Sequence, residues 1–140
     1  MKYLYLLFLS LAFTVQYTNA QQKLKPEITQ VEFGEKTIIL NKKHAFNYYR
    51  EDNDFVISDL NDNPIITGKI TPLGNKKFVS KIYFVTIGKE FHNKKIVGRN
   101  ELIMALCQYN VITKDFEINN ERLYDFIYKN NEIDTFPVKE

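Results

Sequence analysis

Cysteine is nearly absent from this chain of 140 residues, in which Cys107 is the single one. No disulfide can therefore form within the chain, even in an oxidising compartment. Small secreted domains that depend on disulfides for their stability are excluded by the same count. The fold must instead rest on a hydrophobic core, which a chain of roughly this length can bury without covalent cross-links.

The motifs of common enzyme classes are also missing. The only histidines, His44 and His92, form no short-spaced pair with each other or with a cysteine, as zinc sites require. The chain has no glycine-rich phosphate loop, no Gly-x-Ser-x-Gly and no His-Glu-x-x-His. Cys107 falls in the middle of a predicted helix, where we interpret it as a buried, inert thiol. We predict no catalytic residues, no metal and no cofactor, and we favour a protein that is not an enzyme.

Long apolar runs are absent except at the amino terminus. Lys2 is followed by an apolar run over 3–15, and a polar segment then ends in Thr18 and Ala20, small residues that suit a cleavage site before Gln21. This pattern predicts a cleaved secretory signal peptide over 1–20. The alternative of an uncleaved membrane anchor is disfavoured because a helix needs about 20 apolar residues to span a bilayer. We expect a secreted or periplasmic protein with no transmembrane segment after cleavage.

An excess of one charge sign is lacking as well. The full chain has a net charge of +2 at pH 7, and removal of Lys2 with the signal leaves 18 basic against 17 acidic residues. A nearly neutral, exported chain gives no support for nucleic-acid binding. The abundance of Lys, Asn and Ile favours a bacterial envelope or extracellular protein.

Short β-type segments separated by tight turns are what the mature chain does contain. β-Branched and aromatic residues gather over 29–33, 36–41, 44–50, 54–60, 64–71, 77–88 and 94–97. Between the first two, Gly34 and Glu35 predict a type II′ hairpin turn because glycine stands first. Turns spaced by about ten residues predict an antiparallel β-meander of six to seven short strands over residues 29–97.

The segment 77–88 is the longest one typical of a strand. From Phe84 to Ile87 both of its faces are apolar apart from Thr86, as in a strand that is covered on both sides. We therefore expect it to lie inside the sheet. Helices would cover one face. A curled part of the sheet, the region of Phe46, Tyr48 and Tyr49, or a partner would cover the other.

Two amphipathic helices are predicted after Gly98, over about 100–109 and 119–129, where apolar residues recur at three- and four-residue spacing. Asn100 is the predicted N-cap of the first helix, and Asn110 its left-handed stop. The second helix is predicted to start at Asn119 or Asn120.

Strands followed by helices predict a single α+β domain, here over 29–131, with both helices packed on one face of the sheet. The polar segment 21–28 is predicted to be a flexible leader, and 132–140 a frayed tail.

The acidic turn at 59–63 (DLNDN) places oxygen-bearing side chains at the spacing of a calcium loop. The match fails at the sixth position, where Pro64 replaces the required glycine, and at the twelfth, where Ile70 replaces the bidentate glutamate. Asp and Asn are also favoured in hairpin turns because their side chains bond to the local backbone. We interpret 59–63 as a turn, and 51–54 likewise.

Lysines gather at several turns. In a simple meander alternate turns lie at the same end of the sheet, which would bring together Lys42, Lys43, His92, Lys94 and Lys95. Such a basic rim would attract an anionic polymer or lipid headgroups. The simpler alternative is that lysines at turns keep the sheet soluble and protect its edges.

Tyr48 and Tyr49 follow Phe46 closely, so aromatic rings face both sides of one predicted strand. One side belongs to the core. The other is a candidate surface for a ligand or partner, because tyrosine suits sites that are apolar at one end and wet at the other. Cross-strand packing is the alternative.

The leading hypothesis is an exported binding module whose partner is an unidentified protein or an anionic polymer. One alternative is a small secreted hydrolase, or an inhibitor of one, that uses scattered carboxylates with His44 or His92. Another is a structural subunit that pairs with a second chain through a sheet edge.

Overall fold

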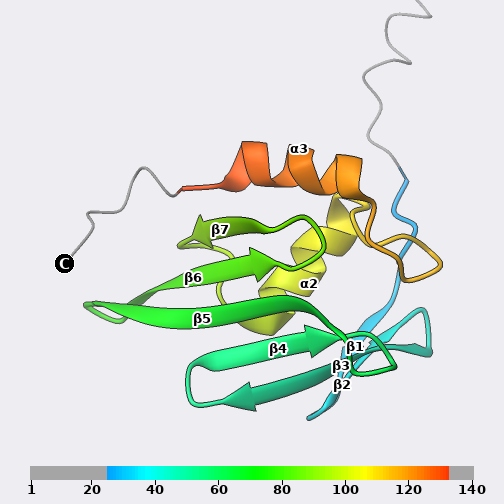
Figure 1. Ribbon diagram of the computed structural model, residues 1–140, viewed down its shortest axis with the longest axis horizontal. Helices are drawn as coiled ribbons and strands as arrows, with labels where there is room; N and C mark the ends of the chain where they lie inside the picture. Colours follow the sequence, from blue (N-terminus) through cyan, green and yellow to red (C-terminus); the bar gives the residue numbers. More distant parts are fainter. Residues whose placement is uncertain (1–24, 133–140) are drawn as a thin grey trace, which may run out of the picture.

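The structure, a computed structural model, describes residues 25–132, which form seven strands followed by two helices (Figure 1). The elements are β1 (Val31–Phe33), β2 (Thr37–Leu40), β3 (Lys43–Glu51), β4 (Asp54–Ser58), β5 (Pro64–Gly74), β6 (Lys77–Phe84), β7 (Lys89–Asn93), α2 (Gly98–Gln108) and α3 (Asn120–Asn130). Each strand pairs antiparallel with the next, in the order β1-β2-β3-β4-β5-β6-β7. The predicted α+β meander is confirmed. The predicted signal peptide, residues 21–24 of the leader and the tail from 133 onward lie outside the described residues.

Two of the hairpins use the same turn sequence. Asn41 and Lys42 have φ angles of 49° and 65° between β2 and β3, and Asn75 and Lys76 have φ angles of 52° and 60° between β5 and β6. Positive φ at both central residues is the mark of a type I′ turn, whose twist matches that of the flanking strands. Asparagine adopts this conformation readily because its short polar side chain bonds to nearby backbone.

The first turn differs from the predicted type II′ turn. The N–H of Gly34 donates to the C=O of Thr37 at 2.9 Å, so Glu35 and Lys36 are the central residues, and Gly34 does not have a positive φ. Glycine at position 34 has another role, since a Cβ there would overlap the Thr37 hydroxyl in its present orientation. The prediction was wrong because glycine here permits a close approach and not a left-handed turn.

β6 and β7 differ most from the prediction. β6 ends at Phe84, where the chain turns back and Gly88 has a φ of 63°, so the predicted strand over 77–88 is too long. β7 occupies 89–93, where the sequence predicts a loop, and the predicted strand 94–97 instead leads into α2. Phe91 is the single apolar residue of β7, which makes its alternation a weak signal. The expectation that the segment 77–88 lies inside the sheet is confirmed, since β6 pairs with β5 on one side and β7 on the other.

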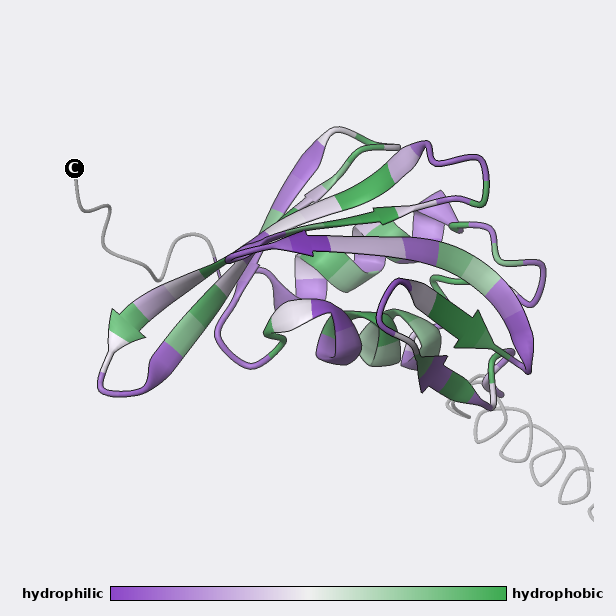
Figure 2. Cartoon of the chain, turned by 90° about the horizontal axis from the view of Figure 1, so that it is seen from below, coloured by the Kyte–Doolittle hydropathy of each residue, from purple (hydrophilic) through white to green (hydrophobic). Residues whose placement is uncertain are grey.

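Both helices cover the same face of the sheet, as Figures 1 and 2 show. On β6, Ile82 and Phe84 are almost fully buried on this face, whereas Tyr83 between them is 42% exposed. Val85, just after the strand, is 41% exposed. The expectation that 77–88 is covered on both sides is therefore wrong, because the helices lie on one side only.

The core lies between the covered face of the sheet and the helices. Phe91 joins these layers, since its ring centroid lies 6.2 Å from that of Phe84 and 5.1 Å from that of Phe126. Gly68 on β5 lies under the ring of Phe55, which a Cβ at position 68 would overlap. The largest fully buried side chains are Phe55, Phe84, Phe91, Phe126, Ile38, Leu40, Ile57, Ile66, Ile82, Leu102, Ile103 and Leu106.

α2 starts two residues before its predicted N-cap, Asn100. Its N-cap residue is Val97, whose side chain makes no capping bond, and the Glu101 carboxylate accepts from the Val97 N–H at 3.1 Å. Gly98 has a φ of 82°, and its N–H donates to the buried Ser80 hydroxyl at 3.0 Å. The prediction was wrong because this bond to β6, which no local pattern reveals, begins the helix at Gly98.

The other predicted helix ends are confirmed. The side-chain oxygen of Asn119 accepts from the N–H of Arg122 at 3.0 Å and so caps α3. Asn110 has a φ of 54° just after α2, as a left-handed stop requires.

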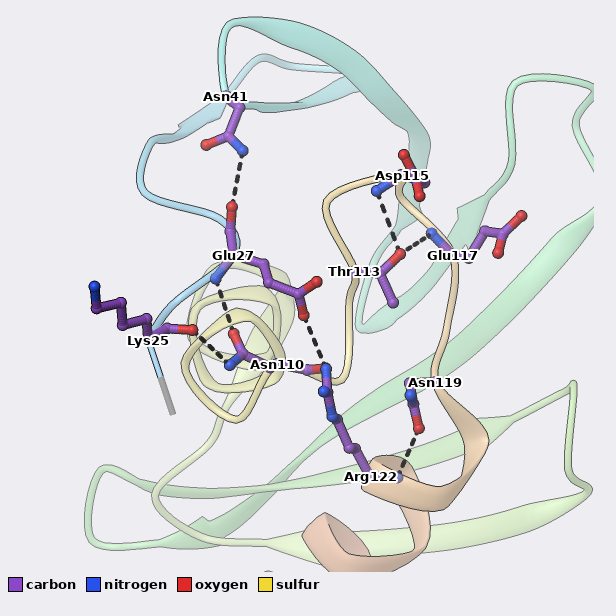
Figure 3. Close-up of polar contacts among 9 residues, drawn as sticks. All are labelled: Lys25, Glu27, Asn41, Asn110, Thr113, Asp115, Glu117, Asn119 and Arg122. Carbon is purple, nitrogen blue, oxygen red and sulfur yellow. Dashed lines mark hydrogen bonds and ion pairs between the residues drawn. The ribbon is translucent and has the colours of Figure 1, made fainter. Parts of the chain in front are cut away.

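Residues 25–28, part of the predicted flexible leader, pack against the fold (Figure 3). Ile28 is buried in the core. The Asn110 side chain donates to the C=O of Lys25 at 2.9 Å and accepts from the N–H of Glu27 at 3.0 Å. The Glu27 carboxylate lies 2.8 Å from Arg122. The structure differs from the prediction here because Asn110, 83 positions from Glu27 in the chain, supplies the contact.

The outer edge of β7 is closed by residues at the end of α3 and just after it. The Asn131 side-chain oxygen accepts from the N–H of His92 at 3.0 Å, and the N–H of Glu132 donates to the C=O of His92 at 2.8 Å. The Asn93 side chain donates to the C=O of Asn130 at 2.8 Å. These bonds satisfy backbone groups to which another strand would otherwise bind.

Candidate functional site

The thiol and the two histidines of the chain lie on opposite sides of the sheet. Cys107 is 3% exposed in the core on α2, and burial raises its pKa to about 12. His44 and His92 lie on the uncovered face, paired in register with Ile39 and Lys81. They form no Cys–His pair, and the interpretation of Cys107 as a buried thiol is confirmed.

His92 has two charged neighbours on the uncovered face. Its Nε2 lies 3.8 Å from the Glu90 carboxylate, which lies 3.9 Å from the Lys81 ammonium. Burial lowers the pKa of His92, Lys81 lowers it further, and Glu90 opposes the change. The lower pKa favours the neutral form of the imidazole.

The acidic turn at 59–63 bonds to its own backbone. The Asp59 carboxylate accepts from the N–H groups of Asn61 and Asn63 at 2.9 Å each, and from the Asn63 side chain at 3.1 Å. These donors, chiefly those of Asn63, lower the pKa of Asp59. The turn interpretation is confirmed, and no group of three or more His, Cys, Asp or Glu within residues 25–132 is placed to hold a metal ion.

The structure separates the lysines that the sequence predicts in one basic rim. Lys42 and Lys43 stand at the β2–β3 turn, whereas Lys94 and Lys95 follow β7 at the opposite end of the strands. His92 lies within β7. The predicted grouping is wrong because the last strand is 89–93 and not 94–97, which reverses the end at which Lys94 and Lys95 stand.

A groove opens between the β5–β6 hairpin, which projects beyond the other strands in Figures 1 and 2, and the segment from β7 into α2. Its volume is about 600 Å³. Phe78, at 44% exposure, offers an apolar surface among four lysines. We call this cavity the basic groove; it is lined by Lys76, Lys77, Phe78, Lys94, Lys95, Val97 and Glu101.

Local hydrogen bonds hold the backbone around the basic groove. The Asn93 side-chain oxygen accepts from the N–H groups of Lys95 at 2.7 Å and Ile96 at 2.8 Å. The bond from Gly98 to Ser80 holds the start of α2 against β6. Asn93 and Ser80 are both buried, so two inward polar side chains set the shape of a groove whose lysines face solvent.

A second cavity, of about 560 Å³, lies at the same end of the strands, where β3 passes the end of β2. It contains two of the predicted binding residues, Tyr48 and Tyr49. Tyr48 packs in the covered layer with its ring centroid 6.1 Å from that of Phe55, and Tyr49 on the other face is 59% exposed. We call this cavity the tyrosine cleft; it is lined by Glu35, Lys36, Tyr48, Tyr49, Arg50, Asp52 and Arg99.

Arg99 enters the tyrosine cleft from the second residue of α2. Its guanidinium carbon lies 4.0 Å from the Tyr48 ring centroid and 5.0 Å from that of Phe33. Nη1 donates to the C=O of Gly34 at 2.7 Å, and Nε to the Asn100 side chain at 2.8 Å. Burial lowers the pKa of Arg99 and Tyr48 opposes this, but the guanidinium is charged at pH 7.

Ten of the fourteen residues that line the two cavities were not predicted as site residues, among them Lys76, Lys77, Phe78 and Arg99. The first three follow from turn order, since the β5–β6 turn and the end of β7 lie at the same end of a meander. The order of the turns brings these residues close to Lys94 and Lys95 only when β7 is placed at 89–93. For Arg99 no local signal exists, because Gly34, to which it donates, is 65 positions away.

The charged side chains that line the two cavities are mostly cationic. The whole chain carries a net charge of only +2. The two cavities together are lined by seven cationic side chains against three anionic ones. An anionic ligand would therefore be drawn to these cavities.

Comparisons with protein-family models, with curated proteins and with solved structures each found no match for this chain. Over residues 25–132, no helix has the length and apolar character needed to cross a bilayer. With Cys107 as the single cysteine, the chain forms no internal disulfide.

Proposed function

We propose that this protein is an exported, non-enzymatic binding module of the bacterial envelope or extracellular space that binds an anionic polymer in the basic groove. The observation that carries the proposal is the convergence of four lysines beside the exposed ring of Phe78. The separation of Cys107 from both histidines supports a non-enzymatic role. The signal peptide predicted over 1–20 supports export.

Lysine is the residue expected for a polymer with unevenly spaced charges. Each ammonium group is a compact charge on a flexible stem, so it adjusts to anionic groups at different positions. A polymer also engages several lysines at once, which raises its overall affinity above that of a single anionic unit. Phe78 and Val97 supply apolar contact to the polymer backbone between its charges.

The first test is titration of the mature chain, residues 21–140, with dextran sulfate and with neutral dextran as the control. Calorimetry measures the binding, and we expect the chain to bind dextran sulfate and not neutral dextran. The affinity should fall as NaCl rises from about 50 to about 500 mM, because exposed charges are screened by salt. Equal binding to both polymers would contradict the proposal.

A matched pair of variants tests the location of the site. Lys77→Glu with Lys95→Glu reverses two charges in the basic groove, and Lys42→Glu with Lys43→Glu reverses two at the opposite end of the strands. We expect the first pair to weaken dextran sulfate binding at least about tenfold, or about 1.4 kcal/mol, and the second to change it less than about twofold. Equal losses would mean that net charge alone attracts the polymer, and would refute the groove.

Export is tested separately from binding. The full chain, expressed in a bacterial host, should be recovered from the periplasm or the medium with Gln21 as its first residue. Retention of the uncleaved chain in the cytoplasm would refute the exported location and leave the groove proposal to the binding tests.

A further inference from the structure

β3 continues beyond the end of its neighbour β2. The last register pair joins Asn47 to Thr37, and one further bond runs from the N–H of Tyr48 to the C=O of Lys36 at 2.9 Å. β3 itself runs on to Glu51 and is paired with β4 along its other side. On the β2 side, residues 48–51 therefore border the tyrosine cleft and not a strand.

The backbone of Arg50 faces this open side. In an antiparallel ladder the N–H and C=O groups of alternate residues point to the same side. The N–H and C=O of Arg50 therefore point to the β2 side, as the N–H of Tyr48 does. Within the described part of the chain, no strand pairs with Arg50 on that side. An edge of this kind is a template to which an extended peptide adds as a strand. At about 3.3 Å per residue, it accommodates a segment of about four residues.

Arg99 places a positive charge beside this edge. Its hydrogen bonds use Nε and Nη1, and Nη2 makes none to any residue from 25 to 132. The ring contacts with Tyr48 and Phe33 orient the guanidinium. A guanidinium that is held in place and keeps free N–H groups is suited to a carboxylate, whose planar oxygens match its geometry.

We infer that the edge of β3 over 48–51 binds a short extended peptide segment that carries a carboxylate, with the peptide added as a strand and the carboxylate paired with Arg99. Either an acidic side chain or the carboxyl terminus of the peptide supplies the same planar group. A saccharide lacks the alternating N–H and C=O groups that the edge of β3 would pair with. This site is separate from the basic groove, and the inference does not depend on the function proposed above.

The test uses three peptides with the same core. They are acetyl-Thr-Val-Thr-Val-Glu-amide, its Gln counterpart, and acetyl-Thr-Val-Thr-Val with a free carboxyl terminus. Each is titrated into the 15N-labelled mature chain while the backbone amide shifts are followed. We expect shifts at 49–52 and at 99, with the Gln peptide at least about tenfold weaker because it lacks the charge-assisted bond. The carboxylate peptide that binds more tightly shows whether the carboxylate comes from an acidic side chain or from the carboxyl terminus.

Arg50→Pro and Arg50→Ala form the matched pair for the edge. Both remove the side chain, but only proline removes the N–H that faces the cleft, and the β3–β4 ladder does not use that N–H. We expect Arg50→Pro to bind the peptides at least about tenfold more weakly than Arg50→Ala does, because both variants lack the Arg50 side chain and only the proline variant also lacks the N–H. Thermal melting checks that both variants fold.

Arg99→Lys tests the carboxylate contact without altering the strand. It keeps the charge but loses the planar fork, so it should weaken both carboxylate peptides and leave the Gln peptide unchanged. With Lys77→Glu and Lys95→Glu combined, the peptides should still shift the amides at 49–52 and at 99, which separates this site from the basic groove.

Three results would overturn the inference. The first is peptide binding that Arg50→Pro leaves intact, or shifts confined to 76–78 and 94–97. The second is binding of tetragalacturonate at the tyrosine cleft in preference to all three peptides. The third is a dimer of the mature chain in light scattering that Arg50→Pro separates into monomers, since a second copy would then occupy the edge.

Discussion

Asn110 combines two roles that have different origins in the sequence. Its left-handed conformation, with a φ of 54°, follows from the local rule that helices end in glycine or asparagine. Its side-chain bonds to Lys25 and Glu27 do not, because those residues lie 85 and 83 positions away. At the residue scale, backbone conformation was therefore predictable, whereas the long-range contacts of the same residue were not.

Substitution of Asn110 separates these two roles. Asn110→Gly keeps the left-handed conformation and loses the side-chain bonds, which should cost about 1–2 kcal/mol. Asn110→Ala loses the bonds and adds backbone strain, for a total of about 2–4 kcal/mol. Urea denaturation measures both values, and hydrogen exchange at the Glu27 amide should accelerate in both variants. Unchanged exchange at Glu27 would show that Asn110 does not hold the amino-terminal segment.

Cys107 should make the stability of the fold sensitive to alkaline pH. Burial raises the thiol pKa to about 12, whereas in the unfolded chain it ionises near its ordinary value of 9.0. Above pH 9 the unfolded state therefore loses a proton that the folded state keeps, so stability falls as pH rises and the loss is complete near pH 12. The direction follows from a folded-state pKa that lies above the unfolded one.

The measurement compares the native chain with Cys107→Ala, so that the tyrosines and lysines, which also titrate in this range, cancel. Between pH 7.5 and 10.5 the free energy of unfolding of the native chain should fall by about 2 kcal/mol more than that of the variant. Parallel pH profiles for the two proteins would contradict the assigned pKa.

At the scale of elements, the two helix starts differ in how far sequence could predict them. α3 has a side-chain cap, Asn119, and the residue type identifies it. α2 begins at Gly98 through a bond to Ser80 on β6, and Asn100 lies inside its first turn. A capping residue thus marks a helix start only where no tertiary bond has already fixed one.

This difference predicts unequal effects for two similar substitutions. Asn119→Ala should destabilise the fold by about 1 kcal/mol because it removes the bond to the Arg122 N–H. Asn100→Ala, at an exposed position in α2, should change stability by less than about 0.5 kcal/mol. Chemical denaturation of both variants is the measurement, and equal losses would contradict the assigned caps.

β7 shows how one misplaced element changes the inferred surface. Its sequence alternates Phe91 with polar residues and has no second apolar residue, so the apolar pair Ile96 and Val97 gives the stronger strand signal. The structure instead makes 94–97 the connection to α2. The end of the sheet at which a residue stands depends on the number of strands that precede it in the meander. With the last strand at 89–93 and not at 94–97, Lys94 and Lys95 stand at the end opposite Lys42 and Lys43.

At the scale of the whole molecule, the turns carried most of the predictable information. Asn41–Lys42 and Asn75–Lys76 turns connect neighbouring strands, and successive hairpins of this kind allow only a meander. The one-sided cover was only partly predictable. Two helices were expected on one face, but the apolar residues Tyr83 and Val85 falsely indicated a second cover.

The cavities depend on the arrangement of the whole fold. The basic groove needs the projecting β5–β6 hairpin beside the start of α2, and the tyrosine cleft needs β3 to extend past β2. Both conditions concern the relative lengths of strands, which periodicity defines least well. The sequence therefore identified some lining residues, such as Lys95 in the basic groove and Tyr48 in the tyrosine cleft, but not the neighbours of each in its cavity.

The bond between Glu27 and Asn110 also has a consequence for the order in which the chain assembles. Hairpins between neighbouring strands close short loops, whereas this contact closes one of 83 residues, so we expect it to form later. If the chain is exported amino end first, as the predicted signal implies, residues 25–28 cross the membrane long before their partner. We expect this segment to stay undocked until the α2–α3 connection has also crossed, so that its protection from proteolysis reports completed translocation of the whole domain.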